Sequence, residues 1–252
     1  MTRKPYFGFN HWLIIICITF VSLSYLVLYV AVNSLPAPST LAAVAWNVET
    51  VDASAGIAGD GISMAFDASG LPAVCYYDST SGDLNFSSRA TGGWVSELVD
   101  ETTVVMGKGC DIAYNSSGSH FVVSYYNSTG GDLRYGRRDG GGAGSGCTST
   151  QWNCEDVDTT GVVGEYSSIA INPSNGRTTI AYYDGTVGAS QYAYRVGSGG
   201  GSGCADTDWT CEAIEDGGVA TDYGKYIDLV FQSNGTPHVA YSDESGVADV
   251  AL

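Results

Sequence analysis

The sequence predicts an all-β protein built from about four copies of one antiparallel sheet and preceded by a single N-terminal membrane helix. Three observations carry this prediction: a motif that recurs four times after residue 45, a turn signal at the same place in each copy, and an uncharged apolar run near the N-terminus. Beyond residue 45 no long apolar stripe with a 3.6-residue period is found, and glycine is scattered throughout. That part of the chain is therefore expected to form strands and no helices.

The N-terminal run from residue 13 to residue 32 is long enough to cross the hydrocarbon core of a bilayer as a helix. Arg3 and Lys4 precede it, and no basic residue follows it closely, which predicts a cytoplasmic N-terminus over residues 1–12. Residues 33–45 would then form a short stalk. We expect residues 13–32 to be an uncleaved signal-anchor that places the remainder outside the cytoplasm.

A cleaved signal peptide is the alternative to an anchor. Such signals have a shorter apolar stretch that is followed closely by small residues at the cleavage site. The best match, Ala43-Val44-Ala45, lies well beyond the end of the apolar run. This distance favours the anchor.

Composition narrows the range of partners. The chain has 252 residues with 27 Asp and Glu against 10 Lys and Arg, a formal net charge of −17. A surface that binds nucleic acid needs clustered Lys and Arg to neutralise phosphates. The expected partners are therefore the membrane, through the N-terminal helix, and a glycan or protein ligand, with no nucleic acid.

The repeat has the form Trp-x-x-Glu-x-(Val/Ile)-(Asp/Glu). It occurs as WNVETVD from Trp46, WVSELVD from Trp94, WNCEDVD from Trp152 and WTCEAIE from Trp209. Between these segments lie CYYD, SYYN, AYYD and AYSD, and an aromatic residue follows the first three of them at a constant distance. Agreement of three landmarks in register indicates an internal repeat of about 50 residues.

Each repeat contains short strand-like runs that are bounded by turn residues. The first two runs are joined by Ser-Gly or Asn-Gly in every unit, and both dipeptides suit a tight hairpin because they tolerate positive φ. Units of four antiparallel strands predict the blades of a β-propeller. The expected propeller spans residues 46–252, with an orphan outer strand at 46–52, blades at about 57–100, 101–158 and 159–216, and an incomplete blade at 217–252.

Two arrangements of these blades remain open. The orphan strand could complete the last blade and close a four-bladed ring, or the chain could be a truncated copy of a larger propeller, which we favour. A β-solenoid and stacked β-sandwiches are the structural competitors. Solenoid repeats are shorter, and sandwich domains would not begin with an orphan fourth strand.

The repeats resemble those of extracellular β-propellers of the sialidase-like (BNR) type, over about residues 46–252. The true Asp-box, Ser-x-Asp-x-Gly-x-Thr-Trp, is missing, since Asp67-Ala-Ser-Gly70 has its Asp and Gly too far apart and no Trp follows. The resemblance therefore implies the architecture alone. Sialidase activity is not expected.

The cysteines predict disulfides in an exported chain. Cys147 and Cys154, like Cys204 and Cys211, lie seven residues apart around a landmark Trp, which is too far for the usual zinc spacing. We expect two local disulfides that each stabilise a hairpin by about 2–3 kcal/mol. Cys75 and Cys110 are expected to be small buried residues, with a bond between neighbouring blades as the alternative.

Carboxylates gather in the loops that follow the second and fourth strands of each blade. A ring of such carboxylates could hold calcium, which takes six to eight oxygen ligands. The opposing interpretation is that Asp favours these turns because its side chain bonds the local backbone. The candidate ligand or cation site consists of Asp78, Asp83, Asp132, Asp184 and Asp243.

Other repeated side chains point to structure. Glu49, Glu97, Glu155 and Glu212 recur once per unit on the outermost strand, where a solvated charge protects an edge, so no catalytic pair is expected. The repeated Tyr and Trp are expected to pack between blades, with a sugar-stacking platform as the alternative. The three histidines are too dispersed for a triad or a metal site.

These observations predict a membrane-anchored, extracytoplasmic β-propeller that serves as a binding or scaffolding module for a glycan, a protein or a divalent cation. Calcium is the one cofactor considered, and catalytic residues are not recognised. A propeller-type secreted hydrolase such as a glycosidase is the alternative. A purely structural surface repeat is the third option.

Overall fold

A computed structural model of the chain describes residues 45–53, 56, 58–101, 106–142, 144–215, 223–243 and 248–251. The described residues from Glu49 onward belong to one compact unit. The expected anchor at residues 13–32 lies outside the described residues. Within the described residues there is no helix with the length and apolar character needed to span a membrane.

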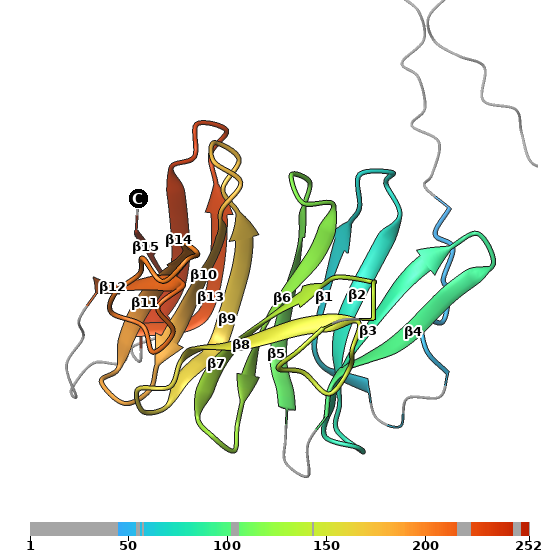
Figure 1. The fold of residues 1–252 in the computed structure, drawn as a ribbon, viewed down its shortest axis with the longest axis horizontal. Helices are drawn as coiled ribbons and strands as arrows, with labels where there is room; N and C mark the ends of the chain where they lie inside the picture. The colour runs from blue at the N-terminus through green and yellow to red at the C-terminus, as the bar shows by residue number, and fades with distance from the viewer. Residues whose placement is uncertain are drawn as a thin grey trace, which may run out of the picture. The chain divides into compact units, whose positions relative to one another are not determined.

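Fifteen described strands form four antiparallel sheets (Figure 1). Sheet 1 contains β1 (Ala58–Phe66), β2 (Pro72–Asp78), β3 (Asp83–Ala90) and β4 (Gly93–Asp100). Sheet 2 contains β5 (Met106–Asn115), β6 (His120–Asn127), β7 (Asp132–Arg138) and β8 (Trp152–Asp158). Sheet 3 contains β9 (Val163–Ile171), β10 (Thr178–Asp184), β11 (Ala189–Arg195) and β12 (Trp209–Glu215). Sheet 4 contains β13 (Tyr223–Phe231), β14 (Pro237–Asp243) and β15 (Ala248–Ala251).

The strands of each sheet follow one another in chain order, as in an up-and-down meander. This confirms the all-β class and the repeated antiparallel sheet. First strands of consecutive sheets pack together in the order β1, β5, β9 and β13. Closure of this row into a ring is not seen among the described strands, and residues 46–52, expected to form an orphan outer strand, have no regular secondary structure.

The hydrophobic core is divided into three clusters, and each lies between two consecutive sheets. Phe86 of sheet 1 packs with Ile112 and Trp152 of sheet 2 in the first cluster. Later clusters join sheet 2 to sheet 3 and sheet 3 to sheet 4. We refer to these three contacts between sheets as joints. Their repetition explains why the same apolar pattern recurs in every unit.

The glutamate of the repeated motif bridges the first two joints. Glu97 of β4 accepts two hydrogen bonds from the Arg138 guanidinium of sheet 2, at 2.7 and 3.0 Å, and one from the Trp152 indole N–H at 2.8 Å. Glu155 makes the same contacts with Arg195 and Trp209 of sheet 3. The expectation that these glutamates are solvated edge charges is therefore wrong for both. They are bidentate partners of an arginine in the next sheet.

The acidic residue that ends the motif makes a second connection. The Tyr125 hydroxyl donates to Asp100 at 2.8 Å, the Tyr182 hydroxyl to Asp158 at 2.9 Å, and the Tyr241 hydroxyl to Glu215 at 2.5 Å. In each pair the tyrosine belongs to the second strand of one sheet and the acid to the last strand of the sheet before it. We refer to the Glu–Arg–Trp and acid–Tyr contacts together as the connectors.

Residues 49–52 use the same connectors without forming a strand. Glu49 accepts from the Arg89 guanidinium at 3.1 Å and from the Trp94 indole at 3.0 Å, and the Tyr76 hydroxyl donates to Asp52 at 2.5 Å. This segment therefore lies against sheet 1 as the outer strand of a preceding sheet would.

The structure contains three disulfides. Cys147–Cys154 and Cys204–Cys211 form as the spacing predicts. Cys75 and Cys110 are also bonded, with Cα atoms 6.4 Å apart, so the alternative of a bond between neighbouring sheets is what forms. Three disulfides fit an oxidising compartment such as the cell exterior.

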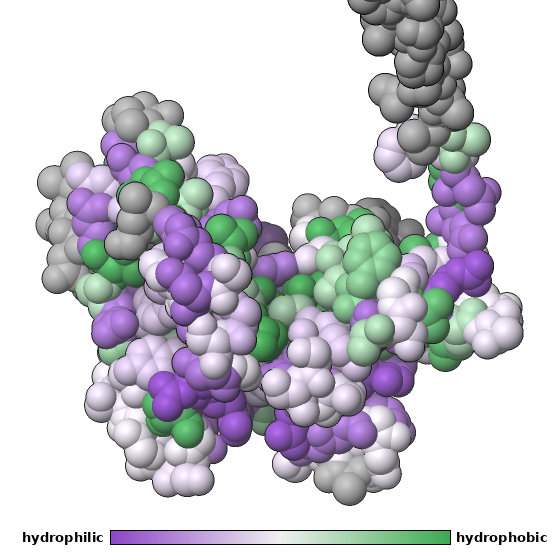
Figure 2. Space-filling model, turned by 90° about the horizontal axis from the view of Figure 1, so that it is seen from above, coloured by the Kyte–Doolittle hydropathy of each residue, from purple (hydrophilic) through white to green (hydrophobic). Residues whose placement is uncertain are grey.

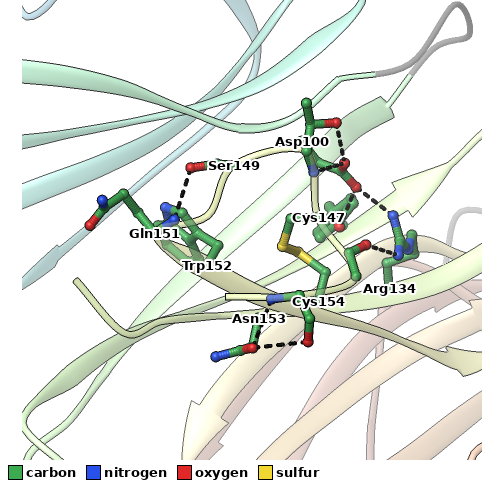
Figure 3. Close-up of a disulfide and its surroundings, with 12 residues drawn as sticks. Asp100, Arg134, Cys147, Ser149, Gln151, Trp152, Asn153 and Cys154 are labelled. Atoms are coloured by element: carbon green, nitrogen blue, oxygen red, sulfur yellow. Dashed lines mark hydrogen bonds and ion pairs between the residues drawn. A yellow bond between two sulfur atoms is a disulfide. The ribbon is translucent and has the colours of Figure 1, made fainter. Parts of the chain in front are cut away.

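The Cys147–Cys154 loop covers a buried ion pair (Figure 3). Asp100, 2% exposed, accepts hydrogen bonds from Arg134 and from the Thr148 amide, in addition to the Tyr125 bond described above. Arg134 also donates to the Gly146 carbonyl at 2.9 Å. The carboxylate is therefore satisfied by two strands and the disulfide loop, which offsets the cost of burying its charge.

Candidate functional site

Each first strand carries a β-bulge near its start. Register shifts occur around Asp60, Lys108, Glu165 and Lys225, which are equivalent residues of the four repeats. A glycine before the bulge allows close approach to the preceding sheet. At Gly164, for example, a Cβ would lie 2.6 Å from the Leu133 Cα. Bulges of this kind redirect side chains and are common beside binding sites.

The residue that follows the charged one adopts a left-handed backbone in all four sheets. In sheets 1 and 2 it is glycine, with φ of 72° at Gly61 and 65° at Gly109. In sheets 3 and 4 it is tyrosine, with φ of 54° at Tyr166 and 56° at Tyr226. A non-glycine residue in this conformation costs about 1–2 kcal/mol. Strain of this kind is typical of functional positions, where the surrounding structure maintains it.

The two tyrosine rings meet at the surface. Their centroids are 4.8 Å apart with planes inclined at 52°, and the Tyr166 ring contacts the buried Tyr183 ring edge-on at 6.3 Å. Tyr226 is 74% exposed and Tyr166 is 36% exposed. The pair forms an aromatic platform, defined here as Tyr166 and Tyr226, that is anchored on one side by Tyr183 and open on the other.

A cavity of about 230 Å³ lies beside the platform. It is lined by residues from the first strands of sheets 1, 2 and 3 and from the end of β6: Gly61, Lys108, Gly109, Tyr126, Glu165 and Tyr166. Gly61 and Gly109 carry no side chain, so no side chain projects into the cavity from these two positions. The cavity therefore joins an aromatic wall to a lysine, a glutamate and a nearly buried tyrosine.

Charges at the bulges alternate in sign. Asp60, Lys108, Glu165 and Lys225 follow one another from sheet 1 to sheet 4. Lys108 and Lys225 are the only lysines after Lys4 in a chain of net charge −17. Lys225 Nζ lies over the Tyr183 ring, 5.6 Å from its centroid, which is a cation–π contact. Lys108 and Glu165 line the same cavity, so the site offers a cation and an anion together in an otherwise acidic protein.

Burial and charge raise the pKa of two tyrosines here. The pKa of Tyr166 is raised by burial and by the neighbouring Tyr226 and Glu165, with Lys225 opposing the shift. Burial, followed by Glu165 and Asp132, raises the pKa of Tyr126. Both side chains therefore remain neutral phenols at physiological pH. Each can donate a hydrogen bond to a ligand.

The carboxylates that the sequence analysis selected lie in turns at the ends of the second and third strands. Asp78 accepts the Thr80 amide at 2.8 Å, Asp184 accepts the Thr186 amide at 2.9 Å, and Asp132 accepts the side-chain amide of Asn127 at 3.1 Å. Asp83 is paired with Asp78 in the strand register, and Asp243 with Tyr223. These contacts are those of turn chemistry.

In the part of the chain that the structure describes, no group of three or more His, Cys, Asp or Glu is arranged to hold a metal ion. The pKa of Asp132 and of Asp184 is raised, in each case mainly by burial. The cation site at these five aspartates stays a prediction.

Sequence reasoning missed Tyr166 and Tyr226. Both stand in the series Gly-Asp-Gly, Gly-Lys-Gly, Gly-Glu-Tyr and Gly-Lys-Tyr, which aligns residues 59–61, 107–109, 164–166 and 224–226. Replacement of glycine by tyrosine at one position of this series was a usable signal. So was the concentration of lysine at the same place.

No protein-family model matches the chain, and no curated protein matches its sequence. Among solved structures, a triple mutant of AofleA from Arthrobotrys oligospora aligns with a TM-score of 0.49 and 12% identity, over 75% of this chain and 52% of that one. This chain thus spans about half the length of AofleA.

Two further solved structures are similar over most of this chain. A fucose lectin from Kordia zhangzhouensis in complex with methyl-fucoside aligns with a TM-score of 0.37 and 14% identity, over 61% of this chain and 96% of that one. A puromycin hydrolase mutant aligns with a TM-score of 0.45 and 12% identity, over 77% of this chain and 29% of that one.

Proposed function

We propose that the chain is a glycan-binding module held at the outer surface of a membrane, and that the Tyr166–Tyr226 platform with its adjoining cavity is the binding site. One observation carries the proposal. Two tyrosines occupy left-handed backbone positions where the other sheets have glycine, and their rings are held together at the surface.

A sugar ring has an apolar face of C–H groups and a rim of hydroxyls. The exposed Tyr226 ring suits the apolar face, since aromatic stacking contributes about 0.5–1.5 kcal/mol beyond area burial. Lys108, Glu165 and the Tyr126 hydroxyl lie at the cavity beside it and suit the hydroxyls. A few polar groups around an apolar wall is the usual composition of a small-molecule site.

Two features support the proposed location. Residues 13–32 have the length and composition of a membrane anchor. All six cysteines of the described residues are paired in disulfides, which suits an exported protein. A module at the outer surface of a membrane would meet glycans of other cells or of the surrounding matrix.

The test uses the full chain in detergent on a glycan array, followed by calorimetry with the sugars that bind. The double variant Tyr166→Gly/Tyr226→Gly removes both rings and gives sheets 3 and 4 the residue that sheets 1 and 2 already have. Affinity is expected to fall at least about tenfold. The matched control, Tyr166→Phe/Tyr226→Phe, keeps both rings and should stay within a few-fold of the wild type.

Two results would overturn the proposal. One is an array on which the wild-type chain binds no sugar. The other is a glycine variant that binds as tightly as the wild type while its disulfides and thermal transition are intact.

A further inference from the structure

The outward face of β1 carries three exposed apolar side chains: Ile62 at 60%, Met64 at 58% and Phe66 at 57% exposure. In the other first strands the equivalents of Ile62 and Met64 are buried against the preceding sheet. Ile227 and Leu229 of β13, for example, are 9% and 4% exposed. Figure 2 shows that apolar residues form separate patches on a largely hydrophilic side of the molecule. The β1 face therefore has the composition of a joint but no partner sheet among the described residues.

A complementary face lies at the other end of the row, on sheet 4. Ala240 of β14 and Val250 of β15 are exposed, and so is Asp228 of β13. Cys75 and Phe86, the equivalents of Ala240 and Val250 in sheet 1, are fully buried by sheet 2. Sheet 4 thus presents the side that, in the other three sheets, receives the next sheet.

The residue types of the two faces match. One position on each second strand meets one position on the next first strand, as Cys75–Cys110 in the first joint and Ser124–Ser167, with hydroxyls 3.0 Å apart, in the second. In the third joint the pair is Ala181 and Ile227, which share a core cluster. At the two free faces the pair is Ala240 and Ile62. This is the alanine and isoleucine of the third joint again.

A polar contact matches as well. In the second joint the Asp111 carboxylate accepts the Ile169 amide at 2.8 Å. The equivalent residues at the free faces are Asp228 on β13 and Met64 on β1. Asp228 is exposed and would accept the Met64 amide in the same way.

Residues 49–52 supply the remaining part of such a joint. Glu49 and Asp52 already hold this segment on sheet 1 in the manner of an outer strand. Sheet 4 has three strands among the described residues, one fewer than each of the other sheets, and β15 is the last of them. A sheet 4 placed on the β1 face would meet residues 46–52 at β15.

We propose that the β1 face is covered by sheet 4 of a second copy of this chain. Within one copy the two faces lie at opposite ends of the row of sheets that runs from β1 to β13. When sheet 4 of each copy packs on the β1 face of the other, both faces of both copies are covered. The resulting dimer is closed and has two-fold symmetry.

The Cys75–Cys110 disulfide provides the design for a test. Ile62→Cys and Ala240→Cys place cysteines at the equivalent positions of the proposed joint. The full chain, in detergent and in a Cys17→Ser background, is produced as two differently tagged forms with one substitution each. A covalent dimer carrying both tags is expected on a non-reducing gel. Ser63→Cys replaces Ile62→Cys in the matched control, because adjacent strand residues point to opposite faces.

The outcomes are distinguishable. A mixed-tag dimer with Ile62→Cys and not with Ser63→Cys supports the proposal, as does a shift from dimer to monomer by light scattering in Met64→Lys. An intrachain bond in the double variant Ile62→Cys/Ala240→Cys would overturn it in favour of ring closure within one copy. Absence of any disulfide between the tagged chains, or equal disulfide formation in the Ser63→Cys control, would also overturn the proposal. It would mean that the β1 face is not covered by sheet 4 of a second copy.

Discussion

The connectors on the outer strands and the bulges on the first strands both recur along the chain, but they vary in opposite ways. The connectors keep the same residue types, so that Glu97 and Glu155 each bond an arginine and a tryptophan of the next sheet. The bulges keep their backbone conformation and change their residues, from glycine in sheets 1 and 2 to tyrosine in sheets 3 and 4.

This difference separates what holds the repeat together from what distinguishes one copy from another. A connector must satisfy a buried carboxylate, and few residues other than Arg, Trp and Tyr can reach it with the required donors. The bulge needs only a residue that tolerates positive φ, for which glycine suffices. Tyrosine at that position adds backbone strain, and the bulge does not need its side chain. We therefore take the tyrosines as an indication of a binding site.

The largest expected effect on stability comes from raising the pH until the connector tyrosines lose their hydroxyl protons. Burial and the negative charge of the bonded Asp100 raise the pKa of Tyr125, and burial beside Asp158 raises that of Tyr182. Burial and the hydrogen bond to Glu215 raise the pKa of Tyr241 to about 12. The folded state therefore retains protons that the unfolded state loses near pH 10. Stability should be complete below pH 10 and fall by up to about 1.4 kcal/mol per pH unit for each such tyrosine as the pH rises toward 12.

Guanidinium unfolding followed by tryptophan fluorescence between pH 8 and 12 measures this fall. Tyr182→Phe removes one of the protons and keeps the ring. Its stability should be lower than that of the wild type at pH 8 and should decline less steeply with pH. Parallel declines for the two proteins would contradict the assignment of the proton to the Tyr182–Asp158 connector.

Much of the fold was predictable because strand alternation and turn chemistry are local. The Asn-Gly and Ser-Gly turns and the motif at the outer strand were enough to predict repeated antiparallel sheets. The partners across the joints were not predictable, because alternation shows which face a side chain occupies and not which residue of the next sheet it meets. Glu97 was therefore assigned to solvent, although Arg138 follows the aromatic landmark Tyr135 by three residues, as Arg195 follows Tyr192.

The candidate site was less predictable than the fold. Its tyrosines become prominent only when their φ angles are known, and Tyr166 and Tyr226 meet because two first strands lie side by side. Cys75 and Cys110 illustrate the same limit. Their spacing carried no signal, and the packing of β2 against β5 decides their pairing.

A smaller effect is expected where one connector differs from the others. Asp100 is bonded by Arg134 as well as by Tyr125, whereas Asp158 has the tyrosine and a local amide. Asp100→Ala leaves Arg134 with one carboxylate partner in place of two, since Asp156 lies 2.7 Å from its guanidinium, and should lower the free energy of unfolding by about 2–4 kcal/mol. Asp158→Ala should cost about 1–3 kcal/mol.

Urea denaturation of both variants measures the difference. Arg134→Leu added to Asp100→Ala should restore part of the loss, since it removes a buried charge that has lost one of its two carboxylate partners. Equal losses for the two aspartates, or no recovery in the double variant, would show that Arg134 does not make the first joint different from the second.

The smallest expected effect has the opposite sign. Tyr226→Gly relieves the left-handed strain, and because the ring is 74% exposed it loses little packing. The free energy of unfolding should rise by up to about 1 kcal/mol.

Tyr226→Ala is the matched control, because it removes the ring but keeps a Cβ in the strained conformation and should show no gain. A glycine variant no more stable than the alanine variant would mean that the position is unstrained, and the contrast between bulge and connector would then rest on exposure alone. A gain with glycine would mean that the tyrosine is kept against stability, as expected of a residue retained for binding.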